Sequence, residues 1–256
     1  MNKPFAWPKE MRCAVSLTFD DARLTQIEAG IPILDRFGLR GTFYVLVPEV
    51  LKFHEAWRTA VSHGHEVGNH TINHPCSANF VWCKNHLEKY TLQQMCDEFD
   101  HADEAIHRAL GIWPKTFAYP CGNKFVGRGD QTRSYVPLVN GHFLAGRGFR
   151  DETPNNPQLC DLAQLAGVDA DRHSFEVLKH WIDRTLEVGG WLCFVNHDVS
   201  PTLAQGIKPD TLAQVCDYLK QHTGVWVDTI ANIAQYVASQ QVMKNEADFR
   251  QKELQP

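Results

Sequence analysis

Residues 14–19, with the sequence AVSLTF, form an apolar, β-favouring run without the strict alternation of a strand that has one face in water. A run of this kind is typical of a strand buried on both faces, as in a parallel sheet covered by helices. Two adjacent acids, Asp20 and Asp21, follow it directly. Because active-site residues of parallel α/β sheets gather where the strands end, we expect both acids at the functional edge of such a sheet.

Strand-like and helix-like segments alternate along the rest of the chain, which is the pattern of βα units. Further strands are expected over residues 41–47, 115–119, 143–146, 191–196 and 225–227, and helices over residues 26–37, 55–63, 91–110, 175–188, 211–221 and 230–238. A chain of 256 residues can bury one large core. We therefore expect a single domain over residues 1–242 and a charged, frayed C-terminal tail over residues 243–256.

Composition and charge narrow the function classes. The net charge of −5 and the pI near 6.2 give no electrostatic footprint for nucleic acid, and no run of 18 apolar residues predicts a membrane span. The N-terminal residues lack the apolar region of a secretory signal, and the eight cysteines form no Cys-x-x-Cys pair. These features favour a cytoplasmic chain with buried thiols. His74, Cys76, Cys83 and His86 could be drawn as a zinc cluster, but their spacing matches no common zinc finger.

Two histidines four residues apart, His70 and His74, supply the donors of a possible metal site. Two neutral imidazoles and one carboxylate readily hold zinc, cobalt, nickel or iron, and an open position on the ion can lower the pKa of a water. Adjacent side chains at a strand end point in roughly opposite directions, so one of Asp20 and Asp21 can bind metal while the other takes a proton. There are plainer alternatives: a histidine pair at this spacing is not rare in a chain with 13 histidines, and two adjacent acids at a strand end often form only a turn and a helix cap.

Four motifs in order carry a resemblance to a known family: TFDD at residues 18–21, HTINH at 70–74, FAYPCG at 117–122 and FVNH at 194–197. This series resembles the polysaccharide deacetylases of carbohydrate esterase family 4. The resemblance implies an α/β fold, a distorted, TIM-barrel-like (β/α) barrel with about seven parallel strands. It also implies one bound divalent metal ion, with zinc as the first choice and cobalt, nickel, manganese or iron as alternatives. Asp20 matches the family's general base, His197 its general acid, and Asp21, His70 and His74 its metal ligands.

The third motif departs from the commoner family pattern, in which an arginine precedes the proline pair and a tyrosine follows. Ala118 and Cys121 stand at those positions here, and the Cys121 amide is implied as an oxyanion donor, with Tyr119 and Pro120 beside the substrate. Arg147, at the end of the strand over 143–146, is a candidate to orient the base, although a solvated arginine in a glycine turn fits equally well. Asp198, next to His197, is a candidate to orient the acid.

These observations predict a metal-dependent hydrolase that removes N- or O-linked acetyl groups from a carbohydrate. Two alternatives stay open. Relatives in the superfamily hydrolyse other C–N bonds in small amides or cyclic ureides, and a carbohydrate-binding protein could keep the fold without turnover. Retention of Asp20 and His197 around the metal motif argues against the second alternative, because a pure binder has no need for a base and an acid.

Overall fold

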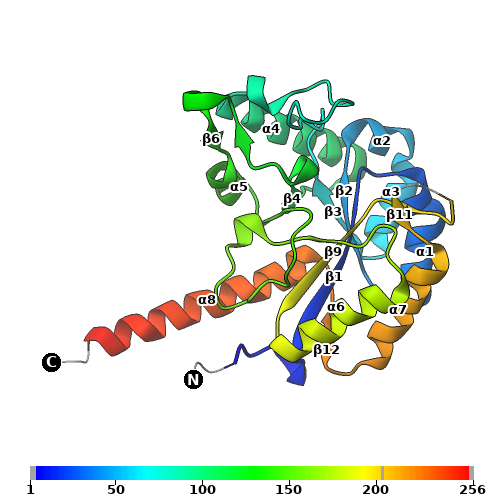
Figure 1. Ribbon diagram of the computed structural model, residues 1–256, viewed down its shortest axis with the longest axis vertical. Helices are drawn as coiled ribbons and strands as arrows, with labels where there is room; N and C mark the ends of the chain where they lie inside the picture. Colours follow the sequence, from blue (N-terminus) through cyan, green and yellow to red (C-terminus); the bar gives the residue numbers. More distant parts are fainter. Residues whose placement is uncertain (1–3, 203–204, 254–256) are drawn as a thin grey trace.

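The structure, a computed structural model, describes residues 4–202 and 205–253 and is built around one curled parallel sheet (Figure 1). The strands along the sheet run in the order β7-β4-β3-β2-β1-β9-β8, and β12 pairs with β1 beside this path. Their bounds are β1 Cys13–Asp20, β2 Thr42–Val45, β3 Glu66–Asn69, β4 Thr116–Ala118, β7 Ala145–Arg147, β8 Val168–Asp169, β9 Trp191–Asn196 and β12 Val225–Val227. The sequence prediction of a distorted α/β barrel is confirmed.

β1 lies at the centre of the sheet, and all eight of its residues are buried. β9 runs along one side of it, while the other side pairs first with β12, at Cys13 to Val15, and then with β2, at Thr18 to Asp20. Burial on both faces explains the continuous apolar run in its sequence. The central position brings Asp20 to the middle of the edge where the parallel strands end.

Helices cover the outer face of the sheet (Figure 1). They are α1 Ile31–Arg36, α2 Val47–Lys52, α3 His54–Ser62, α4 Leu92–Leu110, α5 Val136–His142, α6 Phe175–Val188 and α7 Pro209–Gln221, whereas α8 Ile230–Glu253 packs with Ala14, Tyr44 and Trp191 in a separate core cluster. A capping box opens α4, since Thr91 Oγ1 accepts from the Gln94 amide (3.2 Å) and Gln94 Oε1 accepts from the Thr91 amide (2.9 Å). None of the described helices is long and apolar enough to cross a membrane.

The structure differs from the sequence prediction at several short elements. The strand expected over residues 41–47 ends at Val45, because Pro48 favours the first turn of α2. The helix expected over 26–37 opens with a π-helical stretch, η2 Gln26–Gly30. α5 and the two-residue strand β8 were not predicted, since both are too short for a clear apolar period.

The C-terminal helix α8 extends beyond the domain boundary expected at residue 242. It continues to Glu253, and its last turns project away from the sheet (Figure 1). The expected frayed segment therefore begins as helix, and its residues 254–256 lie outside the described part of the chain. The domain boundary itself stays a prediction.

Candidate active site

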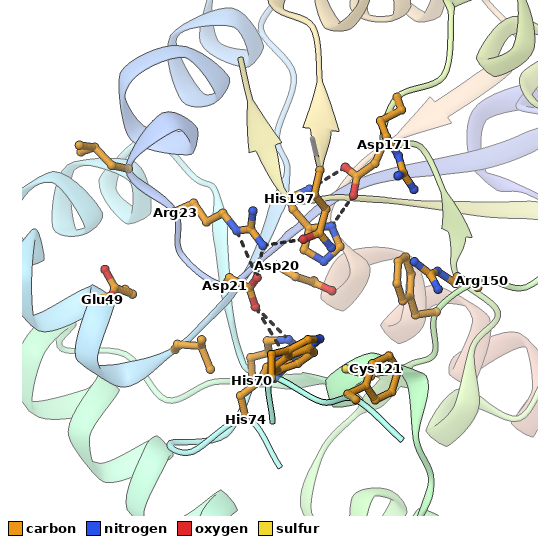
Figure 2. Close-up of a pocket in the computed structure, with 17 residues that line it drawn as sticks. Asp20, Asp21, Arg23, Glu49, His70, His74, Cys121, Arg150, Asp171 and His197 are labelled. Carbon is orange, nitrogen blue, oxygen red and sulfur yellow. Dashed lines mark hydrogen bonds and ion pairs between the residues drawn. The ribbon is translucent and has the colours of Figure 1, made fainter. Parts of the chain in front are cut away.

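A cavity of about 930 Å³ opens where the strands of the sheet end (Figure 2). β1, β3, β4, β7, β8 and β9 each deliver lining residues from their carboxyl ends or from the loops that follow. The lining residues are Asp20, Asp21, Arg23, Leu24, Leu46, Glu49, His70, His74, Phe80, Trp82, Cys121, Phe149, Arg150, Asp171, Arg172, His197 and Gln205. The cavity therefore collects residues of all four sequence motifs, although these lie up to 177 positions apart in the chain.

The end of β1 explains how two adjacent acids reach one cavity. The strand stops at Asp20, and the backbone turns into the left-handed region at Asp21 (φ 76°) and Ala22 (φ 55°). This turn breaks the alternation that would otherwise send the two side chains to opposite faces. Both carboxylates consequently line the cavity.

The histidine motif follows β3 as a tight loop and not as a helix, in keeping with Pro75 directly after His74, because a proline disfavours the helical conformation of the residue before it. Asn69 Oδ1 accepts from the Thr71 amide (2.7 Å), and Thr71 Oγ1 accepts from the His74 amide (3.0 Å). The carboxylate of Glu98, on α4, accepts from two amides between the histidines, each at 3.0 Å. Sequence reasoning missed this buried glutamate, which fixes the loop that carries both rings.

Asp21, His70 and His74 meet as a ligand set. Asp21 Oδ1 lies 3.6 Å from His70 Nε2 and 3.7 Å from His74 Nε2, and the donor atoms of all three lie within 4.8 Å of one another. Metal–nitrogen and metal–oxygen bonds near 2.1 Å at a tetrahedral angle separate ligand atoms by roughly 3.4 Å. The residues present therefore fit a divalent ion such as zinc.

The hydrogen bond of His70 and the burial of His74 both suit metal binding. His70 Nδ1 donates to the Ala118 carbonyl at 2.8 Å, which leaves the Nε2 lone pair toward Asp21. Burial, aided by the charge of His70, lowers the pKa of His74 to about 4. Because a metal-binding imidazole must be unprotonated, this shift favours metal binding at neutral pH.

An arginine from the same loop holds the ligand carboxylate. Arg23 donates to Asp21 Oδ2 from Nη2 at 2.9 Å and from Nε at 3.2 Å, while Oδ1 faces the histidines. Burial raises the pKa of Asp21, but the charges of His70, His74, His197 and Arg23 outweigh it and lower that pKa to about 2. Sequence reasoning missed Arg23, whose only signal was its position two residues after Asp21.

The neighbouring acid, Asp20, is bound by an arginine from the far side of the barrel. Arg147 leaves the end of β7, stacks over the Tyr44 ring at 4.9 Å and donates from Nη2 to Asp20 Oδ1. Its side chain is 0% exposed, so the alternative of a solvated turn arginine is wrong. Gly167 makes room for this side chain, because an added Cβ there would lie 2.7 Å from Arg147 Cδ.

His197 lies across the cavity from the histidine loop, and a different acid from the predicted one holds it (Figure 2). Asp171, after β8, accepts from His197 Nδ1 at 2.6 Å and from its amide at 3.0 Å. Burial lowers the pKa of His197, but the hydrogen bond to Asp171 and the charges of Asp20, Asp171 and Asp21 together raise it. Asp198, the residue predicted for this role, instead accepts from Arg23 and from Thr25 (2.8 Å), because β10 Asp198–Val199 turns it away.

The third motif contributes one of its three predicted residues to the cavity. Cys121 lines the cavity, with its backbone in the left-handed region at φ 53°. Tyr119 and Pro120 do not line it, which corrects their placement beside the substrate. Tyr119 is buried in the core with its hydroxyl donating to the Ala163 carbonyl at 2.6 Å, so it cannot stack on a sugar. Trp82, 61% exposed at the cavity, remains in position for such stacking.

Fold and site together define an α/β-barrel protein with a candidate mononuclear metal centre at the carboxyl ends of its strands. Residues 9–135 match the family model described as polysaccharide deacetylase. This matched stretch, just under half of the chain, carries a polysaccharide deacetylase domain.

Curated proteins are similar to this chain in sequence, and solved structures share its fold. Peptidoglycan-N-acetylglucosamine deacetylase PgdA of Listeria monocytogenes is 27% identical over 109 residues, which are 42% of this chain and 21% of the relative. The chain spans between 5% and 27% of the first three curated relatives it matches. A crystal structure described as a putative polysaccharide deacetylase from Mycobacterium smegmatis shares the fold with a TM-score of 0.69 at 18% identity, covering 93% of this chain and 94% of that one. A structure titled Puue allantoinase gives 0.63 at 15% identity, covering 90% and 91%.

Proposed function

We propose that this chain is a metal-dependent hydrolase that removes acetyl groups, N- or O-linked, from a carbohydrate. One observation carries the proposal. Asp20 and His197 line the same cavity as the set of Asp21, His70 and His74, and each is held by its own buried partner. A base, an acid and an ion site in one cavity are the groups that hydrolysis of an acyl bond requires.

The roles follow from the chemistry of each residue. An ion held by Asp21, His70 and His74 would polarise the acyl carbonyl and lower the pKa of a water. Asp20, positioned by Arg147, takes the proton of the attacking water, and the Cys121 amide donates a hydrogen bond to the oxygen that becomes negative. His197 gives its Nε2 proton to the departing nitrogen or oxygen, since Nδ1 is engaged by Asp171.

The ligand atoms indicate the identity of the metal, Trp82 indicates where a sugar could bind, and the cysteines indicate the compartment. Zinc is the metal we infer, because two imidazoles and a carboxylate are common zinc ligands. Trp82 lies 5.8 Å, centroid to centroid, from the His74 ring, where it can stack on a sugar next to the reacting acyl group. Eight free thiols fit a reducing, cytoplasmic compartment.

Acetate release tests the proposal. Protein freed of metal and then loaded with zinc or cobalt is offered N-acetylated and O-acetylated oligosaccharides, small amides and a cyclic ureide. Metal-dependent acetate release from an acetylated sugar is the expected result. Turnover of amides or ureides alone would reassign the substrate to the C–N hydrolases, and no metal-dependent turnover would favour a carbohydrate-binding protein.

A further inference from the structure

A second set of metal donors shares His74 with the first, and its two thiols have no part in the proposed reaction. One ring nitrogen of His74, Cys76 Sγ and Cys121 Sγ lie within 4.8 Å of one another. The reaction uses the amide of Cys121 but not its thiol. Cys76 is fully buried behind the cavity wall, whereas Cys121 reaches the cavity.

The His74 ring connects the two sets without having to turn. Its Nε2 lies 3.7 Å from Asp21 Oδ1, and its Nδ1 lies 3.5 Å from Cys76 Sγ. A metal–sulfur bond of about 2.3 Å and a metal–nitrogen bond near 2.05 Å at a tetrahedral angle separate the two ligand atoms by roughly 3.5 Å. The observed spacing already matches one edge of such a site. Figure 2 shows Cys121 on the same side of the cavity as His74.

A third nearby thiol is excluded by its own hydrogen bonds. Cys83 Sγ donates to the carbonyls of Asn85 (3.3 Å) and Cys76 (3.7 Å). It is buried beside Cys76 but donates to backbone oxygens, so it provides a matched control.

The donor types set the class of ion. Two thiolates and one imidazole form a Cys₂His set that favours soft, thiophilic cations such as cadmium, whereas Asp21, His70 and His74 offer only oxygen and nitrogen. Binding of such an ion releases both thiol protons and the Nδ1 proton to solvent, because each donor must present a lone pair. Thiolate charge then gathers beside the Cys121 amide.

We propose that His74, Cys76 and Cys121 form a second metal site, selective for thiophilic cations, that shares the His74 ring with the first site and inhibits hydrolysis when filled. The inhibitory part rests on the proposed function. Negative charge beside the Cys121 amide opposes the negative charge that develops on the carbonyl oxygen, and coordination draws the Cys121 peptide toward the ion.

Cobalt titration tests the binding part without any assay of activity. Ligation by thiolate gives a sulfur-to-cobalt charge-transfer band in the near ultraviolet, which a site of oxygen and nitrogen donors lacks. The first equivalent of cobalt is expected to add no such band, and the second to produce it. Cys76→Ser and Cys121→Ala should each lose the band and the second ion, and Cys83→Ser should retain both. A single bound ion without the band in the native chain, or an undiminished band in Cys76→Ser, would overturn the second site.

The inhibitory part has its own readout. Cadmium added to the zinc-loaded chain should suppress acetate release, and Cys76→Ser should resist this suppression by at least about tenfold in cadmium concentration, the usual scale for loss of a group that supports a metal site. Equal suppression of both proteins would overturn the inhibitory role. Presence of the cobalt band in a chain that releases no acetate would leave the second site standing and reject the proposed function alone.

Discussion

Two arginine–aspartate pairs meet at the end of β1, and they are built differently. Asp20 pairs with Arg147, which comes from β7 on the other side of the barrel and is fully buried. Asp21 pairs with Arg23, two residues away in the same loop, and the two side chains are 18% and 29% exposed. One pair crosses the fold, and the other is local and partly hydrated.

The difference teaches what each pair can control. A buried pair that spans the barrel fixes the carboxylate relative to the whole sheet, and losing one partner leaves a charge without compensation. A local pair near solvent contributes little to folding, but it can orient a ligand toward a metal. We therefore assign the positioning of the base to Arg147 and the orientation of the ligand to Arg23.

The largest effect is expected from removing the guanidinium of Arg147. Arg147→Ala leaves Asp20 buried and unpaired, so the free energy of unfolding should fall by about 3–5 kcal/mol. Denaturant unfolding measures this change. The matched control is Arg150→Ala, whose exposed side chain lies 3.8 Å from Asp169 and should alter the same quantity by no more than about 1 kcal/mol.

Arg147→Lys separates charge from geometry in the same pair. Lysine keeps the charge but lacks the planar fork that bonds Asp20 and the Gly148 carbonyl (2.7 Å) together. Turnover should fall roughly 10–100-fold, the usual scale for loss of a supporting hydrogen bond, with the metal retained. Normal kinetics with lysine would show that charge alone suffices and that the cross-barrel geometry is dispensable.

A smaller effect is expected on the pH profile when the partner of His197 is changed. The acid must be protonated, so activity falls as the pH rises through its pKa. Asp171→Asn removes a cause that raises this pKa, and the alkaline limb should move to lower pH. Asp198→Asn is the control, because Asp198 contacts Arg23 and Thr25. A limb that moved with Asp198→Asn but not with Asp171→Asn would exchange their roles.

The smallest effect should come from the local pair. Arg23→Gln is expected to weaken zinc binding roughly tenfold, because loss of the hydrogen bonds to Asp21 Oδ2 outweighs relief of the repulsion between cation and metal. Stability should fall by less than in Arg147→Ala, because the side chain of Arg23 is 29% exposed, although it also bonds Asp198. Calorimetric titration of the metal-free chain with zinc decides the sign, and tighter binding in the variant would show that Arg23 opposes the metal.

Features of the fold and site that depend on residues close together in the sequence were predicted better than those that depend on distant residues. The run in β1 and the capping box at Thr91 are local, and both elements formed as expected. The ligand set was also local in part, since His70 and His74 share one loop. The two-residue strand β8 has no periodic sequence signal, so the sequence analysis could not place Asp171 at the end of a strand.

The partners of the two acids show a second limit. The sequence pattern placed Arg147 at the end of a strand. The contact with Asp20 also requires the sheet to curl so that β7 faces β1, and the sequence pattern of single strands does not determine that curvature. Asp198 was chosen because it adjoins His197 in sequence. Adjacent side chains at a strand end point in different directions, so Asp198 cannot hold the His197 ring. Asp171, 26 positions away in the sequence, holds it instead.

The separate roles of Asp20 and Asp21 are central to the proposed chemistry, and one paired measurement tests them. Zinc content and acetate release are determined on Asp20→Asn and Asp21→Asn side by side. Asp20→Asn should keep its zinc and lose roughly 10²–10⁴ in turnover, because only the proton acceptor is gone, whereas Asp21→Asn should lose both zinc and turnover. An empty site in Asp20→Asn with zinc retained by Asp21→Asn would contradict the assignment.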